Sequence, residues 1–218
     1  MTTENRQGQY FENVDYRGPQ HPVVQAYVRP KWKYIVDNVP LLPEWKILDL
    51  GCGNGIFTQP IAQSYPDVVG LDYSSHLLEE NPHRTLVRGD ATTLPFPDES
   101  FDLAFEGNLL HHVSDRTGVI AEMSRVSRRY VVLLEPNRYN PLMFGLSLVV
   151  AAERGVLKSS VKRLSKEIRD CGLKLQSVLT TGMISQNNTP AFLIPLLQHF
   201  DRQTWWGEYI VMIAKKST

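Results

Sequence analysis

Short apolar runs alternate with amphipathic stretches through the middle of this 218-residue chain. The runs expected to form strands are 46–50, 68–71, 85–88, 102–106 and 130–134, and the stretches expected to form helices are 56–64, 75–80 and 117–126. Strands that are apolar on both faces and separated by helices are typical of a parallel sheet covered on both sides. The pattern therefore predicts an α/β fold of the doubly wound class.

The N-terminal part has a different character. Residues 1–20 are polar with scattered aromatic side chains, and apolar residues over 21–39 recur at helical spacing despite Pro30. We expect one kinked helix or two short ones there, because proline disrupts a helix interior. We assign 1–40 to an N-terminal arm and helical lid, in which aromatic residues such as Tyr10 either close over a ligand or anchor the arm to the core.

The last third of the chain belongs to the main domain, 41–218. We expect helices over 141–153 and 160–171, and two further strands over 173–179 and 208–215 separated by an irregular segment. These two strands bring the expected sheet to seven. Residues 137–172 are interpreted as a cap inserted over the substrate side. The apolar residues Met143, Phe144 and Leu146 either wall an acceptor pocket or join the core. Trp205 and Trp206, before the last strand, are expected to pack in the core or against the hairpin rather than to wall the pocket.

The first expected strand continues directly into a glycine-rich loop, GCGNG, at 51–55. Glycine permits positive φ and close approach of a ligand to the backbone, and ligands of open α/β sheets bind at the carboxyl ends of the strands. The spacing is G-x-G-x-G, whereas the dinucleotide-binding loop has G-x-G-x-x-G. A tight turn without a ligand would also use these glycines.

Acidic residues follow the next two strands. Asp72 ends the second strand, 21 residues after Gly51, where a carboxylate can accept hydrogen bonds from both ribose hydroxyls of a nucleoside. Asp90 closes the third strand, where it can accept from an adenine amino group. Either residue alone is also explained as a turn-forming or helix-capping aspartate. Three such features after three consecutive strands favour a ligand site.

These segments resemble the class I S-adenosylmethionine-dependent methyltransferases, particularly the small-molecule, methyltransferase type 11 branch. The resemblance extends from about Lys46 to Pro136 and is carried by LDLGCGNG, GLDYS, RGDATTLPFPDESFD and LLHHV. It implies a Rossmann-like, mostly parallel seven-stranded sheet with a C-terminal antiparallel hairpin. It also implies S-adenosylmethionine as cofactor, S-adenosylhomocysteine as product, and in-line methyl transfer to a small-molecule acceptor.

The resemblance also implies which residues bind the cofactor. In the family, the glycine loop passes under the methionine part, the second-strand acid binds the ribose, and the third-strand acid lies beside the adenine. The full expected set is Asp49, Gly51, Cys52, Gly53, Asp72, Tyr73, Asp90, Ala91, Glu106 and Tyr10. Because Glu106 replaces the small polar residues common in the family, we expect it to face the sulfonium or the substrate.

Three residues are candidates for a catalytic role. His111 and His112 follow the fourth strand, and histidine accepts protons near neutral pH; packing and loop hydrogen bonding are the alternative roles. Glu135 ends the fifth strand and is expected to face the substrate, with Arg138 and Tyr139 beside a polar acceptor. A general base is required only if the accepting atom must lose a proton.

Composition narrows the function classes. The 23 basic and 23 acidic residues cancel, so charge gives no argument for nucleic acid or an anionic membrane. Cys52 and Cys171 lie far apart in the sequence and outside any CxxC pair, so we expect free thiols and no metal site. The apolar run over 142–152 is too short for a membrane span, and the N-terminus lacks an apolar signal segment. We expect a cytoplasmic monomer or homodimer.

Two other functions are compatible with the same sequence features. A nicotinamide-dependent oxidoreductase would use the same kind of sheet, although the glycine spacing and the absence of a tyrosine–lysine relay motif disfavour it. A non-catalytic S-adenosylmethionine-binding module would retain the glycine loop and both acids.

Overall fold

The computed structural model describes residues 16–199 and 201–216, and it confirms the expected α/β class. The described residues form a seven-stranded sheet in the order β3-β2-β1-β4-β5-β7-β6. Its strands are β1 (Ile47–Leu50), β2 (Val68–Asp72), β3 (Leu86–Arg88), β4 (Phe101–Gly107), β5 (Ser127–Pro136), β6 (Leu173–Thr181) and β7 (Tyr209–Lys216). Neighbouring strands from β3 to β5 are parallel, whereas β7 runs antiparallel to both β5 and β6. The C-terminal antiparallel hairpin is therefore present as expected.

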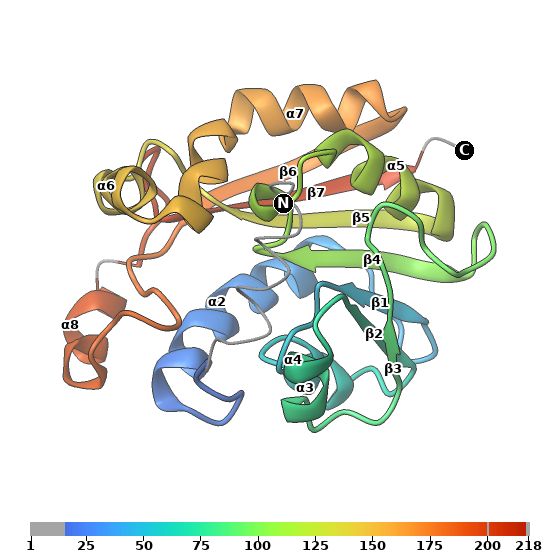
Figure 1. Ribbon diagram of the computed structural model, residues 1–218, viewed down its shortest axis with the longest axis horizontal. Coiled ribbons are helices and arrows are strands. Elements are labelled where there is room, and N and C mark those ends of the chain that lie inside the picture. Colours follow the sequence, from blue (N-terminus) through green and yellow to red (C-terminus); the bar gives the residue numbers. More distant parts are fainter. Residues whose placement is uncertain (1–15, 200, 217–218) are drawn as a thin grey trace.

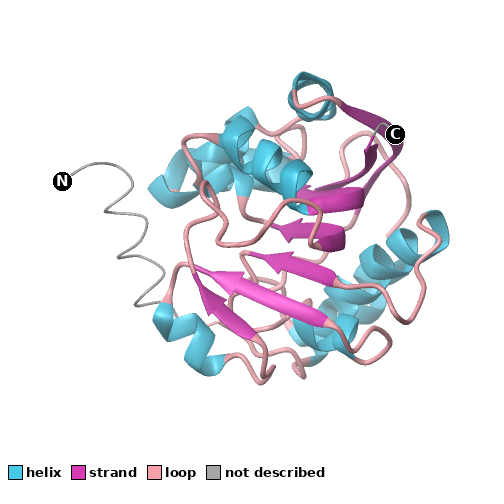
Figure 2. Ribbon diagram, turned by 90° about the vertical axis from the view of Figure 1, so that its right-hand side faces the viewer, coloured by secondary structure: helices cyan, strands magenta, loops and turns pink. Residues whose placement is uncertain are grey.

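Helices lie on both sides of this sheet (Figure 1, Figure 2). The α-helices are α2 (Pro22–Asn38), α3 (Thr58–Ala62), α4 (Ser75–Glu80), α5 (Arg116–Val126), α6 (Pro141–Val149), α7 (Val161–Asp170) and α8 (Ile194–His199). Three 3₁₀ helices are η1 (Leu110–His112), η2 (Ala151–Lys158) and η3 (Ala191–Leu193). Within the described ranges, no helix combines the length and apolar character needed to cross a membrane.

The core consists of two apolar layers, one on each face of the sheet. Alternation along β5 divides its side chains between them: Val132 and Leu134 join the layer under α2 and α3, whereas Val131 and Leu133 join the layer under α5 and α7. All four side chains are fully buried. A strand covered on both faces has apolar residues at consecutive positions, which explains why the central strands were predictable.

The helix expected within a lid is instead a core element. Helix α2 is a single helix that contains Pro30, and its Val23, Tyr27 and Ile35 side chains are fully buried against the sheet. Burial of this apolar face stabilises the helix more than the lost backbone hydrogen bond at proline destabilises it.

Three further expectations about the C-terminal third are wrong. The helix expected over 141–153 ends at Val149, because Val150 is extended, and the chain resumes as η2. The segment expected to be irregular contains η3 and α8. Trp205 and Trp206 are 75% and 36% exposed rather than packed in the core. Their backbone carbonyls accept hydrogen bonds from Asn137 Nδ2 and Asn140 Nδ2, which hold the turn before β7 in place.

Candidate active site

A cavity of about 660 Å³ opens where the central parallel strands end. Its wall is formed by the loops that follow β1, β2, β3 and β4, together with parts of α6, η2 and the segment 185–188. This volume lies within the range of small-molecule sites. The predicted cofactor-binding residues that line it are Asp49, Gly51, Cys52, Gly53, Asp72, Tyr73, Asp90 and Ala91. Tyr10 lies outside the described residues.

The glycine loop has the backbone conformation that its sequence predicts. Gly51, Gly53 and Gly55 have φ values of 71°, 47° and 90°. A Cβ added at Gly55 would lie 2.5 Å from Asn81 Oδ1, so this glycine is required by packing within the protein. At Gly53, by contrast, the nearest described atom outside Gly53 and its two chain neighbours would be Leu77 Cδ1 at 3.8 Å. The backbone at Gly53 therefore faces open space in the cavity.

Asp72 holds this loop from the end of β2. Its Oδ2 accepts a hydrogen bond from Gly53 N at 2.8 Å, and its Oδ1 accepts one from Ser74 N at 2.9 Å. Asp72 also lines the cavity, so its carboxylate lies where a ligand hydroxyl can be bound.

Asp90 forms a turn at the edge of the cavity. Its Oδ1 accepts hydrogen bonds from Thr92 N at 2.8 Å and Thr92 Oγ1 at 2.7 Å, so it forms a turn. It is also exposed and lines the cavity beyond β3. The turn therefore presents the carboxylate to the cavity.

Asp49 is the buried carboxyl group of the cavity. It is 2% exposed, and its Oδ2 accepts a hydrogen bond from Thr58 Oγ1 at 2.6 Å. Burial raises the pKa of Asp49 to about 7, even though the bond from Thr58 opposes this shift. A carboxyl group in such a position is stabilised in its ionised form by a cationic ligand.

Two glutamates lie behind the cavity wall rather than in it. Glu106 is fully buried and accepts hydrogen bonds from Leu109 N at 3.0 Å and Leu134 N at 3.1 Å. Burial raises the pKa of Glu106 well above its usual range, and the neighbouring Glu135 carboxylate adds to this shift. The expectation that Glu106 faces the sulfonium or the substrate is wrong, because its side chain holds the loop after β4 against β5.

Glu135 is likewise fully buried, and its carboxylate accepts hydrogen bonds from Leu110 N at 3.0 Å, His111 Nδ1 at 3.1 Å and Ser159 Oγ at 3.1 Å. Burial alone would raise the pKa of Glu135, but the charges of His111 and Arg116 hold it below its usual value. The expectation that Glu135 faces the substrate is also wrong: it positions His111 from behind.

The two adjacent histidines of η1 line the cavity in different states. His111 Nδ1 contacts Glu135, and its Nε2 lies 3.6 Å from Glu153 Oε2. Burial would lower the pKa of His111, but these two carboxylates raise it to about 9. Burial and the charge of His111 lower the pKa of His112 to about 3, and its Nδ1 lies 3.2 Å from Ala152 O. At neutral pH, His111 is therefore protonated and His112 is neutral.

The remaining wall contains residues that sequence analysis missed. Asn108 has a φ of 62° and donates through Nδ2 to Tyr27 Oη at 2.7 Å, which connects the loop after β4 to α2. A polar residue directly after a strand was an available signal for Asn108. Glu153 gave no such signal, because it falls beyond an unpredicted break between α6 and η2.

The apolar part of the wall comes from α6. Met143 and Leu146 line the cavity, whereas Phe144 is 43% exposed and lies outside it. Arg138 and Tyr139 are exposed on the turn before α6, away from the cavity lining, so the expected contact with an acceptor is not formed.

Comparison with known proteins identifies the family. Residues 48–134 match the methyltransferase domain family. The demethylmenaquinone methyltransferase of Geobacillus stearothermophilus is 30% identical over 159 residues, which cover 66% of this chain and 68% of that protein. The chain belongs to the class I S-adenosylmethionine-dependent methyltransferase family. This assignment disfavours the oxidoreductase alternative.

Other relatives match a smaller share of their length. The demethylmenaquinone methyltransferase of Renibacterium salmoninarum is 36% identical over 103 residues, which cover 45% of this chain and 44% of that protein. The chain thus spans about half the length of the first curated relatives it matches, with 44%, 42% and 53% covered.

Solved structures agree on the fold. An S-adenosylmethionine-dependent methyltransferase from Thermotoga maritima, described as a possible histamine N-methyltransferase, superposes with a TM-score of 0.69 at 20% identity. The match covers 89% of this chain and 91% of that one. A second, from Archaeoglobus fulgidus, has a TM-score of 0.65 at 16% identity, covering 88% and 94%.

The raised pKa of Asp49 predicts a pH-dependent effect of Asp49→Asn on stability. The folded-state pKa of about 7 exceeds the ordinary 3.8, so the wild type loses stability from this group as pH rises from about 4 through 7. The free energy of unfolding of Asp49→Asn minus that of wild type should therefore grow over this interval, by at most ~4 kcal/mol, and then level off.

Urea denaturation of both proteins at several pH values between about 4 and 8 measures this difference. The matched control is Asp67→Asn, at an exposed position directly before β2 and outside the cavity lining, measured over the same pH range. A pH-independent difference for Asp49→Asn would contradict the assigned state of Asp49.

Proposed function

We propose that this chain binds S-adenosylmethionine and transfers its methyl group to a small-molecule acceptor. The observation that carries the proposal is the convergence of the glycine loop, Asp49 and Asp72 in one cavity at the carboxyl ends of β1 and β2. Membership of the methyltransferase family supports the same reaction.

The residues present fit this cofactor. The open space in front of Gly53, where even a Cβ would have no described atom closer than 3.8 Å, accommodates a ligand against the backbone. We assign the ribose hydroxyls to Asp72, the adenine to Asp90 and Ala91, and the methionine end to the glycine loop and Asp49. S-adenosylmethionine supplies an activated methyl group on a cationic sulfur. The buried Asp49 carboxylate favours a cationic ligand nearby, since such a ligand offsets the cost of its burial.

The acceptor side of the cavity lies across from these residues. Met143 and Leu146 provide an apolar surface, and His111 and His112 provide polar groups beside it. Two of the relatives described above are named demethylmenaquinone methyltransferases, and a flat ring with oxygen substituents suits such a mixed wall. We therefore propose an aromatic or quinone-type acceptor. Holding it in line with the methyl group can contribute roughly 7–11 kcal/mol to barrier reduction.

The chain before α2 contributes to closure of the site. Asn54 Nδ2 donates to the carbonyls of Tyr16 and Arg17 at 3.4 and 3.3 Å. Arg17 Nη1 in turn donates to Thr189 O at 2.7 Å and Gln186 O at 3.3 Å. These bonds link the glycine loop to the segment 185–189 across the cavity, and they support a role of the arm in excluding water from the cofactor.

Asp72→Ala should weaken binding of S-adenosylhomocysteine about 100-fold, because two hydrogen bonds to a charged acceptor, of ~1.5 kcal/mol each, are lost. Isothermal titration calorimetry measures the affinity, and circular dichroism checks that the variant is folded. Asp67→Ala, at the opposite end of β2, is the matched control and should bind like wild type. Equal affinities in all three proteins would remove Asp72 from the site.

Incubation with S-adenosylmethionine carrying an isotopically labelled methyl group tests the reaction itself. We expect label in reduced quinones or hydroxylated aromatics, and none in an amine such as histamine, because the wall pairs an apolar surface for a flat ring with imidazole groups for its oxygen substituents. Label in the amine alone would refute the proposed acceptor class. Cofactor binding without transfer to any member of the panel would instead support a non-catalytic binding module.

A further inference from the structure

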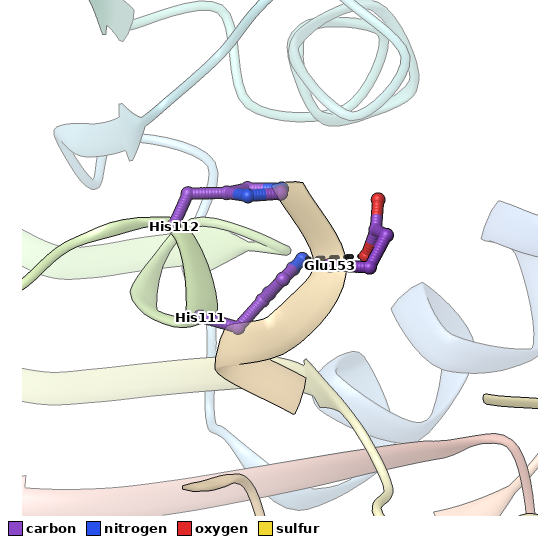
Figure 3. Close-up of side chains that lie close together, drawn as sticks. All are labelled: His111, His112 and Glu153. Carbon is purple, nitrogen blue, oxygen red and sulfur yellow. Dashed lines mark ion pairs between the residues drawn. The ribbon is translucent and has the colours of Figure 1, made fainter. Parts of the chain in front are cut away.

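We propose that His111, His112 and Glu153 bind a divalent transition-metal ion of the zinc type on the acceptor side of the cavity. One ligand atom from each residue lies within 4.8 Å of the others, and all three residues line the cavity. Figure 3 shows the two rings, carried by η1, beside the carboxylate carried by η2. The fold alone brings these residues together, so the spacing of cysteines in the sequence gives no sign of the site.

Each histidine is oriented as a metal ligand by a partner on its other ring nitrogen. His111 Nδ1 contacts the buried Glu135 carboxylate at 3.1 Å, and its Nε2 is directed toward Glu153 (Figure 3). His112 Nδ1 donates to Ala152 O at 3.2 Å, which fixes the tautomer with the lone pair on Nε2. Carboxylate and carbonyl groups behind the ring play this part in known metal sites, where they set the tautomer and the ring orientation.

The spacing also fits an ion better than a direct contact. His111 Nε2 and Glu153 Oε2 are 3.6 Å apart, which is longer than a normal hydrogen bond. In a tetrahedral site with metal–ligand distances of about 2.1 Å, neighbouring ligand atoms lie about 3.4 Å apart. Two histidine nitrogens and one carboxylate oxygen are a ligand set of zinc and of non-haem iron sites that keep an open position.

The surrounding charges favour a cation at this position. Glu135 and Glu153 both face His111, at 3.1 and 3.6 Å. Arg116 lies 3.9 Å from Glu135, but it lies closer to Glu167, at 3.1 Å. The carboxylates around His111 are therefore only partly compensated by arginine, and a divalent ion can take the place of the proton between His111 and Glu153.

Three protein ligands leave a position open toward the cavity. An acceptor oxygen bound there would be oriented and held in its deprotonated form by the ion. This role rests on the proposed methyl transfer, whereas binding of the ion itself does not.

The test uses an untagged protein of residues 1–218, stripped of metal with a chelator. Titration with Zn²⁺ by calorimetry, and with Co²⁺ by its visible absorption, should show one ion per chain. Two variants test the ligands. Glu153→Gln keeps the shape of the side chain, and His112→Phe keeps an aromatic ring against His111. Each variant should bind Zn²⁺ at least about tenfold more weakly than wild type. The matched control is His76→Ala/Glu80→Gln, a partly exposed pair on α4 with a similar separation of 3.8 Å, and it should bind like wild type.

Absence of Zn²⁺ binding to wild type, or unchanged affinity in both folded site variants, would overturn the proposal. Loss of binding in the α4 control would also overturn it. S-adenosylhomocysteine titrations of the same samples separate the two proposals. Ion binding without cofactor binding would contradict only the proposed function, and the reverse would contradict only the metal site.

Discussion

The hydrogen bond from Gly53 N to Asp72 joins the ends of the first two central strands, and the geometry of the cavity depends on it. The same carboxylate accepts from Ser74 N, at the N-cap of α4. The glycine loop has positive φ at three glycines. It is held in one conformation because Asp72 of β2 fixes it in addition to its own turns. Parallel strands make this possible, since their carboxyl ends meet at one edge of the sheet.

On the other side of the cavity, buried glutamate side chains likewise hold a loop in place. Glu106 and Glu135 each accept hydrogen bonds from backbone amides of the chain around η1 or β5, and Glu135 also holds His111. Burying a carboxyl group is costly unless its oxygens accept hydrogen bonds, and the cost is larger when the group is charged. These glutamates are satisfied by the loop that they shape, so their burial fixes the positions of the two histidines.

The fold was largely predictable because the central strands are apolar on both faces, and α4 was predicted with its bounds, Ser75–Glu80. The positions of Asp72 and Asp90 followed from strand ends. The sequence did not predict where the side chains of Glu106 and Glu135 point. The side of the sheet that a residue at the end of a strand faces depends on the register of that strand. Amphipathic periodicity in α2 showed that one face is buried but not which surface covers it. The position of Glu153 in the cavity wall depends on the break between α6 and η2 at Val150. No glycine or proline marks this break in the sequence.

The most direct test of the central claim is calorimetric titration of the wild-type protein with S-adenosylhomocysteine, with NAD as the comparison ligand. The geometry of the glycine loop, Asp49 and Asp72 predicts a single site with roughly micromolar affinity for S-adenosylhomocysteine and no binding of NAD. Binding of NAD, or no binding of S-adenosylhomocysteine by a folded sample, would contradict the account.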